Sequence, residues 1–138
     1  ELKLFDLVLA SGAYSESSYA LTQNGSTSTV EYPSEELNRR LREAAASLNF
    51  PMKEGIIHSS DVFYRESSEY LKEITDVHHC LAVEMESFAL FHNANVLNKK
   101  AACLLTISDS FISDEITTAA ERQNSFTKMM EIALESVV

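Results

Sequence analysis

Two short apolar runs that end in acidic residues constrain the fold of this chain most tightly. Residues 81–83 (Leu-Ala-Val) lead into Glu84 and Glu86, and residues 101–107 lead, through a serine, into Asp109. Apolar runs of this length between polar residues are typical of buried strands, and the stretch between them can hold one crossover helix. Ligands of open α/β sheets bind beyond the carboxyl ends of the strands. We therefore expect these carboxylates to share one edge of a sheet and to form a site there.

Strands and helices alternate along the rest of the sequence, which favours an α/β layer architecture. Ser34 follows a proline and precedes two glutamates, as at a helix N-terminus, and Pro51 should stop this helix. Thr118 and Glu121 have the spacing of a capping box, so the last helix should begin there and continue to the end. The other expected elements are strands over 4–10 and 53–60, a mobile Ser/Thr/Asn/Gly-rich loop over 22–32 and a short helix over 67–75.

Composition narrows the classes of function. The 138 residues suffice for one domain with a core, and 45% hydrophobic with 23% charged residues is an ordinary globular balance. A net charge of −10 disfavours a nucleic-acid partner, because such binding depends on Lys and Arg contacts to phosphates. No apolar run approaches the length of a membrane span. Cys80 and Cys103 lie in apolar surroundings without CxxC spacing, so we expect reduced core cysteines in a cytoplasmic protein without a membrane partner.

Several motifs along the chain carry a resemblance to a known family. They are VEMES (83–87), TISDS (106–110), TTAAERQNSF (117–126), SSDVFY (59–64) and LFDLVLASGAYSES (4–17). At this spacing, the chain resembles the C-terminal half of the bacterial high-molecular-mass (hexameric) purine nucleoside phosphorylases, of the wider nucleoside phosphorylase and uridine phosphorylase family. The N-terminal part of that family's chain has no counterpart here. The resemblance implies a mixed central sheet flanked by helices, with residues 1–138 as the C-terminal part of one nucleoside phosphorylase domain, incomplete at its N-terminal side.

The resemblance gives two residues catalytic roles. Asp109 would donate a proton to N7 of the purine as the glycosidic bond breaks, because a purine anion is a poor leaving group. Arg122 would swing toward this aspartate when the site closes and promote the proton transfer. From the residues alone, Asp109 could instead be a helix cap or turn former, and Arg122 a solvated helix arginine.

Substrate-binding roles follow from the same resemblance. Glu86 would accept hydrogen bonds from the ribose 2′- and 3′-hydroxyls, Met85 would pack on the sugar, and Glu84 would contribute from alongside. Either glutamate could instead simply begin a helix, where acidic residues are common. Phe63 would stack on the purine, although an aromatic residue in this position, taken alone, is more often part of the core. Val83 would line the base pocket. Ser108, of the same Ser-Asp pair as Asp109, is the last substrate-binding residue.

The resemblance implies a purine nucleoside phosphorylase, which uses phosphate as co-substrate and needs no cofactor, assembled as a homohexamer from a trimer of dimers. The family's phosphate-binding loop and arginines belong to its N-terminal part. The first alternative to a phosphorylase is therefore a nucleosidase, which uses water in place of phosphate. The second alternative is a non-catalytic fragment. A uridine phosphorylase is disfavoured because the sequence lacks a Gln-x-Arg pair.

We expect no metal site, since the adjacent His78 and His79 would point to opposite faces of a strand. Ser110 departs from the family, which more often has His there.

Overall fold

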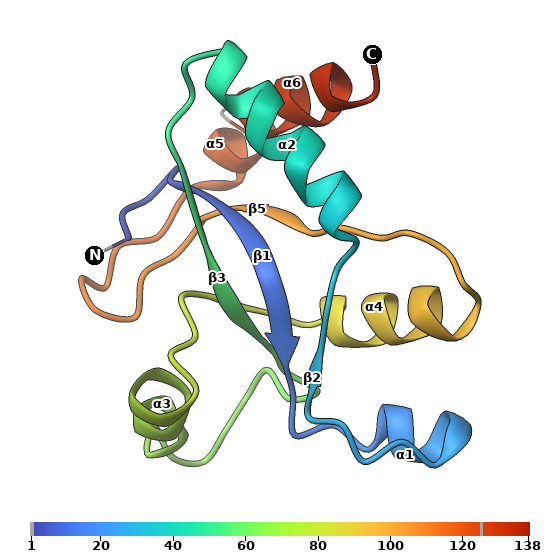
Figure 1. Cartoon of the computed structure of the whole chain (residues 1–138). Helices are drawn as coiled ribbons and strands as arrows, with labels where there is room; N and C mark the ends of the chain where they lie inside the picture. Colours follow the sequence, from blue (N-terminus) through green and yellow to red (C-terminus); the bar gives the residue numbers. More distant parts are fainter. Residues whose placement is uncertain (1, 125) are drawn as a thin grey trace.

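The fold is organised around one central strand with neighbours on both of its edges. The computed structural model describes residues 2–124 and 126–138. Strand β1 pairs in parallel with β3, and β3 pairs in parallel with β4. The other edge of β1 is shared by β2 and β5, which both run antiparallel to it (Figure 1). This mixed sheet confirms the predicted fold class. The strands are β1 (Leu7–Tyr14), β2 (Val30–Glu31), β3 (Met52–Ser59), β4 (Val83–Glu84) and β5 (Leu104–Thr106).

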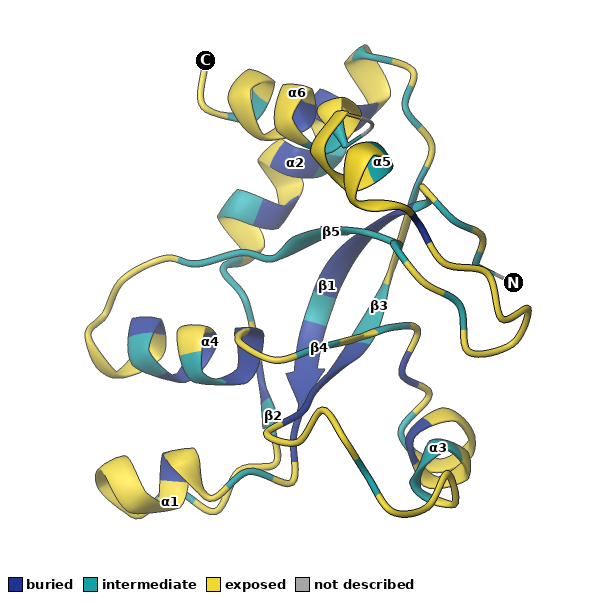
Figure 2. Cartoon of the chain, turned by 180° about the vertical axis from the view of Figure 1, so that it is seen from behind, coloured by how far each residue is buried: buried dark blue, intermediate teal, exposed yellow. Residues whose placement is uncertain are grey.

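Helices cover both faces of the sheet. Side chains alternate between the faces along β1, so that Val8 and Ala10 pack against Phe88 and Phe91 of one helix, α4. On the opposite face, leucines 7 and 9 pack against α2 and against Ile132 of α6. Figure 2 shows the resulting line of buried residues along β1. The helices are α1 (Tyr19–Asn24), α2 (Glu35–Ser47), α3 (Tyr70–Lys72), the π-helical turn η1 (Glu73–Val77), α4 (Ser87–Val96), α5 (Ala119–Asn124) and α6 (Thr127–Ser136).

Helix α2 begins and ends where the sequence predicts. Ser34 is its N-cap, with extended backbone and a side-chain oxygen that accepts from Leu37 N at 3.4 Å. Two glutamates occupy the first turn, and the helix ends before Pro51. Leu41 is buried on the stripe that faces the sheet. Local capping and the apolar stripe thus agree with the tertiary packing.

Strand β1 continues beyond the predicted stop at Ser11 and Gly12. A β-bulge between Ala10 and Gly12 shifts the register against β3, and the strand runs on to Tyr14. A Cβ atom at Gly12 would lie 2.8 Å from Ile56 Cδ1 and 3.2 Å from the Tyr32 ring. Glycine here therefore permits close packing of neighbouring side chains onto the strand rather than ending it.

The segment predicted as a mobile loop, residues 22–32, contains regular structure at both of its ends. It contains the end of α1 and all of β2, and Ser15 N donates to Thr29 O at 2.9 Å. The Asn-Gly turn signal is correct, because Gly25 ends α1 with a φ of 78°. Beyond it, the buried Glu31 carboxylate lies 2.8 Å from Nδ1 of the buried His92, which joins β2 to α4. Prediction from composition missed this pairing because it depends on residues far apart in sequence.

The C-terminal region is two helices rather than the single one predicted. The capping box forms reciprocally, since Glu121 N donates to Thr118 Oγ1 and Thr118 N donates to Glu121 Oε1, each at 3.1 Å. Helix α5 then ends at Asn124, and α6 begins at Thr127; Ser125 lies outside the described residues. Phe126, the N-cap residue of α6, meets the ring of Phe5 edge-on at 6.2 Å.

Both cysteine thiols should react slowly in the folded protein. Burial raises the pKa of Cys80 to about 11, with a further contribution from Glu16, and burial raises the pKa of Cys103 to about 12, with contributions from Glu84 and Glu86. From the ordinary value of 9.0, a rise of two units leaves about 100-fold less thiolate near neutral pH. The thiolate of a thiol with a higher pKa is also more nucleophilic, so reaction with a chromogenic disulfide should be about 10-fold slower in buffer than in denaturant. Rapid native reaction of either thiol would contradict this burial.

Candidate active site

Glu84 caps a helix at the end of β4. Its Oε2 accepts from Glu86 N and from Ser87 N, each at 2.7 Å, and its Oε1 accepts from the Ser87 hydroxyl. The next amide of the helix, Phe88 N, is satisfied by Ser59 Oγ at 3.2 Å. A carboxylate is well placed at a helix N-terminus, whose free N–H groups carry partial positive charge. The alternative reading of this glutamate, that it begins a helix, is therefore realised in the structure.

Glu86 stands at the same helix start but faces solvent. Its Oε2 accepts from Met85 N at 3.2 Å, and the residue is exposed. Met85, its neighbour in sequence, and Val83, in β4, have 41% and 42% of their surfaces exposed. An exposed carboxylate beside exposed apolar side chains can accept hydrogen bonds from hydroxyls while the apolar groups contact carbon atoms. These are the chemical needs of a sugar-binding surface.

Phe63 lies on the segment that follows β3 and is not a core residue. It is 74% exposed, and its ring meets that of Tyr64 edge-on at 4.9 Å. Tyr64 is 89% exposed. The alternative assignment of Phe63 to the core is therefore excluded for this structure, and its ring face is open to a planar ligand.

Asp109 and Arg122 come together after β5. The Ser108 hydroxyl donates to Asp109 Oδ2 at 2.6 Å, and Arg122 Nη1 lies 3.9 Å from the same oxygen. Arg122 is held on α5, whose first turn is fixed by the capping box, and its N donates to Thr118 O at 3.0 Å. About half of each side chain is exposed, so the pair is worth little as a stabilising ion pair. The geometry places the Arg122 cation next to the carboxyl group of Asp109.

The two acidic groups leave the sheet at opposite ends, which corrects the expectation that they share one edge. Strand β4 runs parallel to β3 and β1, whereas β5 runs antiparallel to β1, with Leu7 opposite Thr106. Glu84 and Glu86 therefore follow the end where β1 finishes, and Asp109 follows the end where β1 begins. The physical reason is that β5 occupies the edge of β1 that β3 leaves open, instead of lying beside β4.

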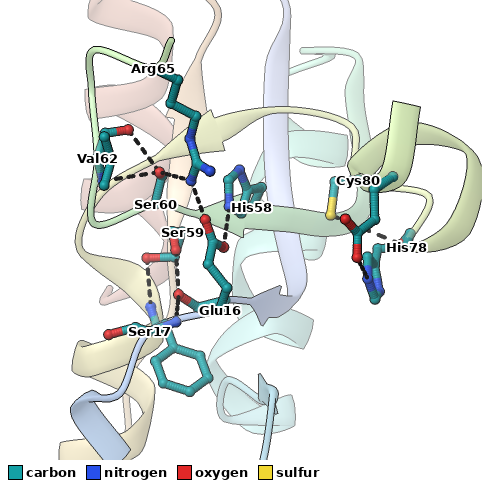
Figure 3. A network of polar contacts seen from close by, with 12 residues as sticks. Glu16, Ser17, His58, Ser59, Ser60, Val62, Arg65, His78 and Cys80 are labelled. Atoms are coloured by element: carbon teal, nitrogen blue, oxygen red, sulfur yellow. Dashed lines mark hydrogen bonds and ion pairs between the residues drawn. The ribbon is translucent and has the colours of Figure 1, made fainter. Parts of the chain in front are cut away.

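A polar network that the sequence did not reveal lies where β1 and β3 end. Glu16 receives the side chains of two residues, the buried His58 with its Nε2 at 2.7 Å and Arg65, both of which point at its carboxylate (Figure 3). Burial raises the pKa of Glu16, but the hydrogen bonds from Arg65 and His58 outweigh burial and lower this pKa to about 2. The signal available in the sequence was weak: a histidine inside an apolar strand, and an acid within a serine-rich strand end.

These features define an α/β protein with a mixed sheet and acidic residues at its strand ends. The family model described as the phosphorylase superfamily matches residues 1–137, so the chain belongs to that superfamily. Among relatives, it is 38% identical over 137 residues to the DeoD-type purine nucleoside phosphorylase of Clostridium beijerinckii, covering 99% of this chain and 57% of that protein. The corresponding protein of Mycoplasma genitalium is 38% identical over 142 residues, covering 98% of this chain and 57% of its own length. This chain thus spans less than two thirds of these relatives.

The fold is also that of a solved structure. A purine nucleoside phosphorylase from Toxoplasma gondii, in complex with immucillin-H, superimposes with a TM-score of 0.81 at 17% identity, covering 98% of this chain and 56% of that one. No helix in the described part of the chain is long and apolar enough to cross a membrane. Within residues 2–124 and 126–138, no group of three or more His, Cys, Asp and Glu side chains could hold a metal ion.

Proposed function

We propose that this chain is part of a purine nucleoside phosphorylase, which converts a purine ribo- or deoxyribonucleoside and phosphate into free base and pentose 1-phosphate. The observation that carries the proposal is the Asp109–Arg122 pair, 3.9 Å apart, in a chain 38% identical over nearly its whole length to DeoD-type purine nucleoside phosphorylases. The proposed enzyme is a cytoplasmic pentosyltransferase that works as a homohexamer, a trimer of dimers, with phosphate as co-substrate and no other cofactor.

Asp109 is the proposed general acid. As the bond between the sugar C1′ and the purine N9 breaks, its electron pair passes into the purine ring, and N7 takes the proton of the Asp109 carboxyl group. A phosphate oxygen forms the new bond to C1′. Arg122 stabilises the carboxylate that remains, because a nearby cation favours the charged form of an acid. Ser108, which donates to Asp109 Oδ2, would hold the carboxyl group and contact the base.

The proposed sugar and base contacts come from the other end of the sheet. Glu86 would accept from the ribose hydroxyls and stabilise positive charge on the sugar ring, with Met85 packed against it. Glu84 would act from alongside by fixing the helix start that carries Glu86, since both of its oxygens are used there. Phe63 would stack on the purine and Val83 would line the base pocket. The structure supports the chemistry of each group, while their action on one nucleoside rests on the similarity to the relatives.

A comparison of two proteins tests the proposal: residues 1–138 alone, and the product of the complete coding sequence. With inosine, the complete product should release hypoxanthine only when phosphate is present, and should form ribose 1-phosphate. Residues 1–138 should bind purine nucleosides weakly and leave them intact, because no phosphate-binding residues are assigned in this stretch.

Each alternative outcome has a distinct meaning. Release of hypoxanthine without phosphate would replace the proposal with a nucleosidase. Absence of release from both proteins would favour the non-catalytic reading. Robust phosphate-dependent release by residues 1–138 would show that this stretch holds phosphate through residues not assigned here. Asp109→Asn serves as the control that ties any release to the proposed site.

A further inference from the structure

The segment between β3 and α3 that carries Phe63 has almost no buried side chains. Residues 61–69 all belong to the described part of the chain, and Arg65 is the one residue among them that is not exposed. Other hydrogen bonds described for this segment are local, such as Val62 N to Ser60 Oγ at 3.2 Å and Glu69 N to Ser67 Oγ at 3.1 Å. A segment with few buried contacts opens at low free-energy cost unless a specific contact holds it.

Arg65 supplies that contact. Its Nη2 donates to Glu16, which lies far away in sequence after β1, and to Ser60 Oγ at 2.8 Å (Figure 3). Its guanidinium group also lies over the Tyr70 ring, 4.4 Å from the ring centre. The side chain is 22% exposed, so these interactions are partly shielded from water. One side chain thus joins the middle of the segment to the end of β1, to the end of β3 and to α3.

The acceptor for Arg65 is itself fixed. Glu16 Oε2 lies 2.7 Å from Nε2 of His58, a fully buried residue of β3, and Tyr14 of β1 pairs with His58 in the sheet. Burial raises the pKa of Glu16, but Arg65 and His58 lower it to about 2, so its carboxylate stays ionised at neutral pH and also in moderately acidic solution. A permanently charged carboxylate anchored in the sheet is a rigid attachment point for a guanidinium group.

We propose that Arg65 is a positioning residue, which fastens the 61–69 segment to Glu16 and so presents the exposed Phe63 ring in a fixed place for the purine. This rests on the proposed function, in which Phe63 stacks on the base. Without the anchor the segment samples many conformations, and binding of the base must order it. The loss appears as weaker binding of the nucleoside, while the proton transfer at Asp109 is unaffected.

Kinetics of variants made in the complete protein test this inference. Arg65→Gln should raise KM for inosine by roughly 10-fold and leave kcat within about twofold, as expected when ordering precedes chemistry. Arg65→Lys should restore part of the loss, because it keeps the charge opposite Glu16. Arg39→Gln is the matched control, since this exposed arginine pairs with a glutamate on α2, and it should change neither constant.

Two combined variants separate positioning from general damage. Residues that act through one interaction are not additive. Arg65→Gln with Glu16→Gln should therefore be no worse than the poorer single variant, and Arg65→Gln should add little in a Phe63→Ala background. A full, independent loss from Arg65→Gln on top of Phe63→Ala would overturn the proposal.

Hydrogen exchange gives a readout that does not depend on activity. Among residues 61–69, the hydrogen-bonded amides of Val62 and Glu69 should exchange about 10-fold faster in Arg65→Gln than in the wild type, with amides of β1 and β3 unchanged. Unchanged exchange in 61–69 would overturn the anchor. A wild-type protein inactive toward nucleosides, with faster exchange in the variant, would overturn the proposed function while upholding the anchor. Faster exchange together with an unchanged KM in an active enzyme would overturn the positioning role.

Discussion

Asp109→Asn should lower kcat/KM for inosine or adenosine by about 10²–10⁴-fold in the complete protein, which is the usual contribution of general acid catalysis. The substitution keeps the shape of the side chain and its place beside Ser108 and Arg122, but it removes the transferable proton. The purine must then leave without protonation at N7, as a poorly stabilised anion. Steady-state rates with each nucleoside at saturating phosphate measure the loss.

A second substrate isolates the proton from other damage. The base of 7-methylguanosine already carries the positive charge that protonation would supply, so Asp109→Asn should affect its cleavage much less. For each substrate, the loss is kcat/KM of the wild type divided by kcat/KM of the variant. The ratio of the losses on the two substrates measures the contribution of the proton transfer. Equal losses on both substrates would show that Asp109 binds or orients the base, and the general-acid role would be withdrawn.

Phe91→Ala should lower the free energy of unfolding by about 3–5 kcal/mol, as large-to-small substitutions of buried aromatics do. Phe91 is fully buried on α4, where it packs with Val8 and Ile57 of the central strands. The substitution removes apolar burial and leaves a cavity that the two-sided packing of the sheet cannot fill. Urea unfolding followed by far-UV circular dichroism measures the change.

Leu90→Ala is the matched control for this prediction. Leu90 is the preceding residue of the same helix and is 47% exposed, so its truncation should change the free energy of unfolding by less than about 1 kcal/mol. Similar losses from both substitutions would mean that burial against the sheet does not set the size of the effect, since alanine is the best helix former and helix propensity favours both variants. That result would contradict the placement of α4 against the sheet.

The local parts of this fold could be predicted from sequence. The Ser34 cap, the stop before Pro51 and the Thr118–Glu121 capping box depend on residues within one helical turn, and all three are present. The apolar run before Ser59 is β3, within a residue of its predicted limits. Such features are set by backbone hydrogen bonding and side-chain period over a few residues, which a single sequence displays directly.

The direction and partner of β5 could not be predicted in this way. An apolar run indicates a buried strand but not which neighbour it pairs with or in which sense. Leu105 pairs with Val8, far away in the sequence, and the choice of an antiparallel ladder depends on which edge of β1 is open. The expected common edge for Glu86 and Asp109 assumed a parallel pair and is wrong for that reason.

In the candidate site, too, long-range contacts could not be predicted from the sequence. The proximity of Asp109 to Arg122 of α5 was expected from the family resemblance, and the two side chains lie 3.9 Å apart, while their catalytic roles stay predictions. Glu84 does accept hydrogen bonds from a helix start, which required an unpaired helix start within its reach, while its role toward the sugar stays a prediction. The Glu16–His58–Arg65 network was missed, because it joins the ends of two strands whose adjacency appears only in the folded sheet.

The pairing of β1 with β5 also has a consequence for biosynthesis. One edge of β1 is closed along its first half only when residues 104–106 are available, whereas β3 reaches its other edge much earlier in the chain. During translation, this part of the strand therefore lacks its β5 partner until residues 104–106 have left the ribosome. An unpaired strand edge is the kind of surface that chaperones bind and that promotes aggregation.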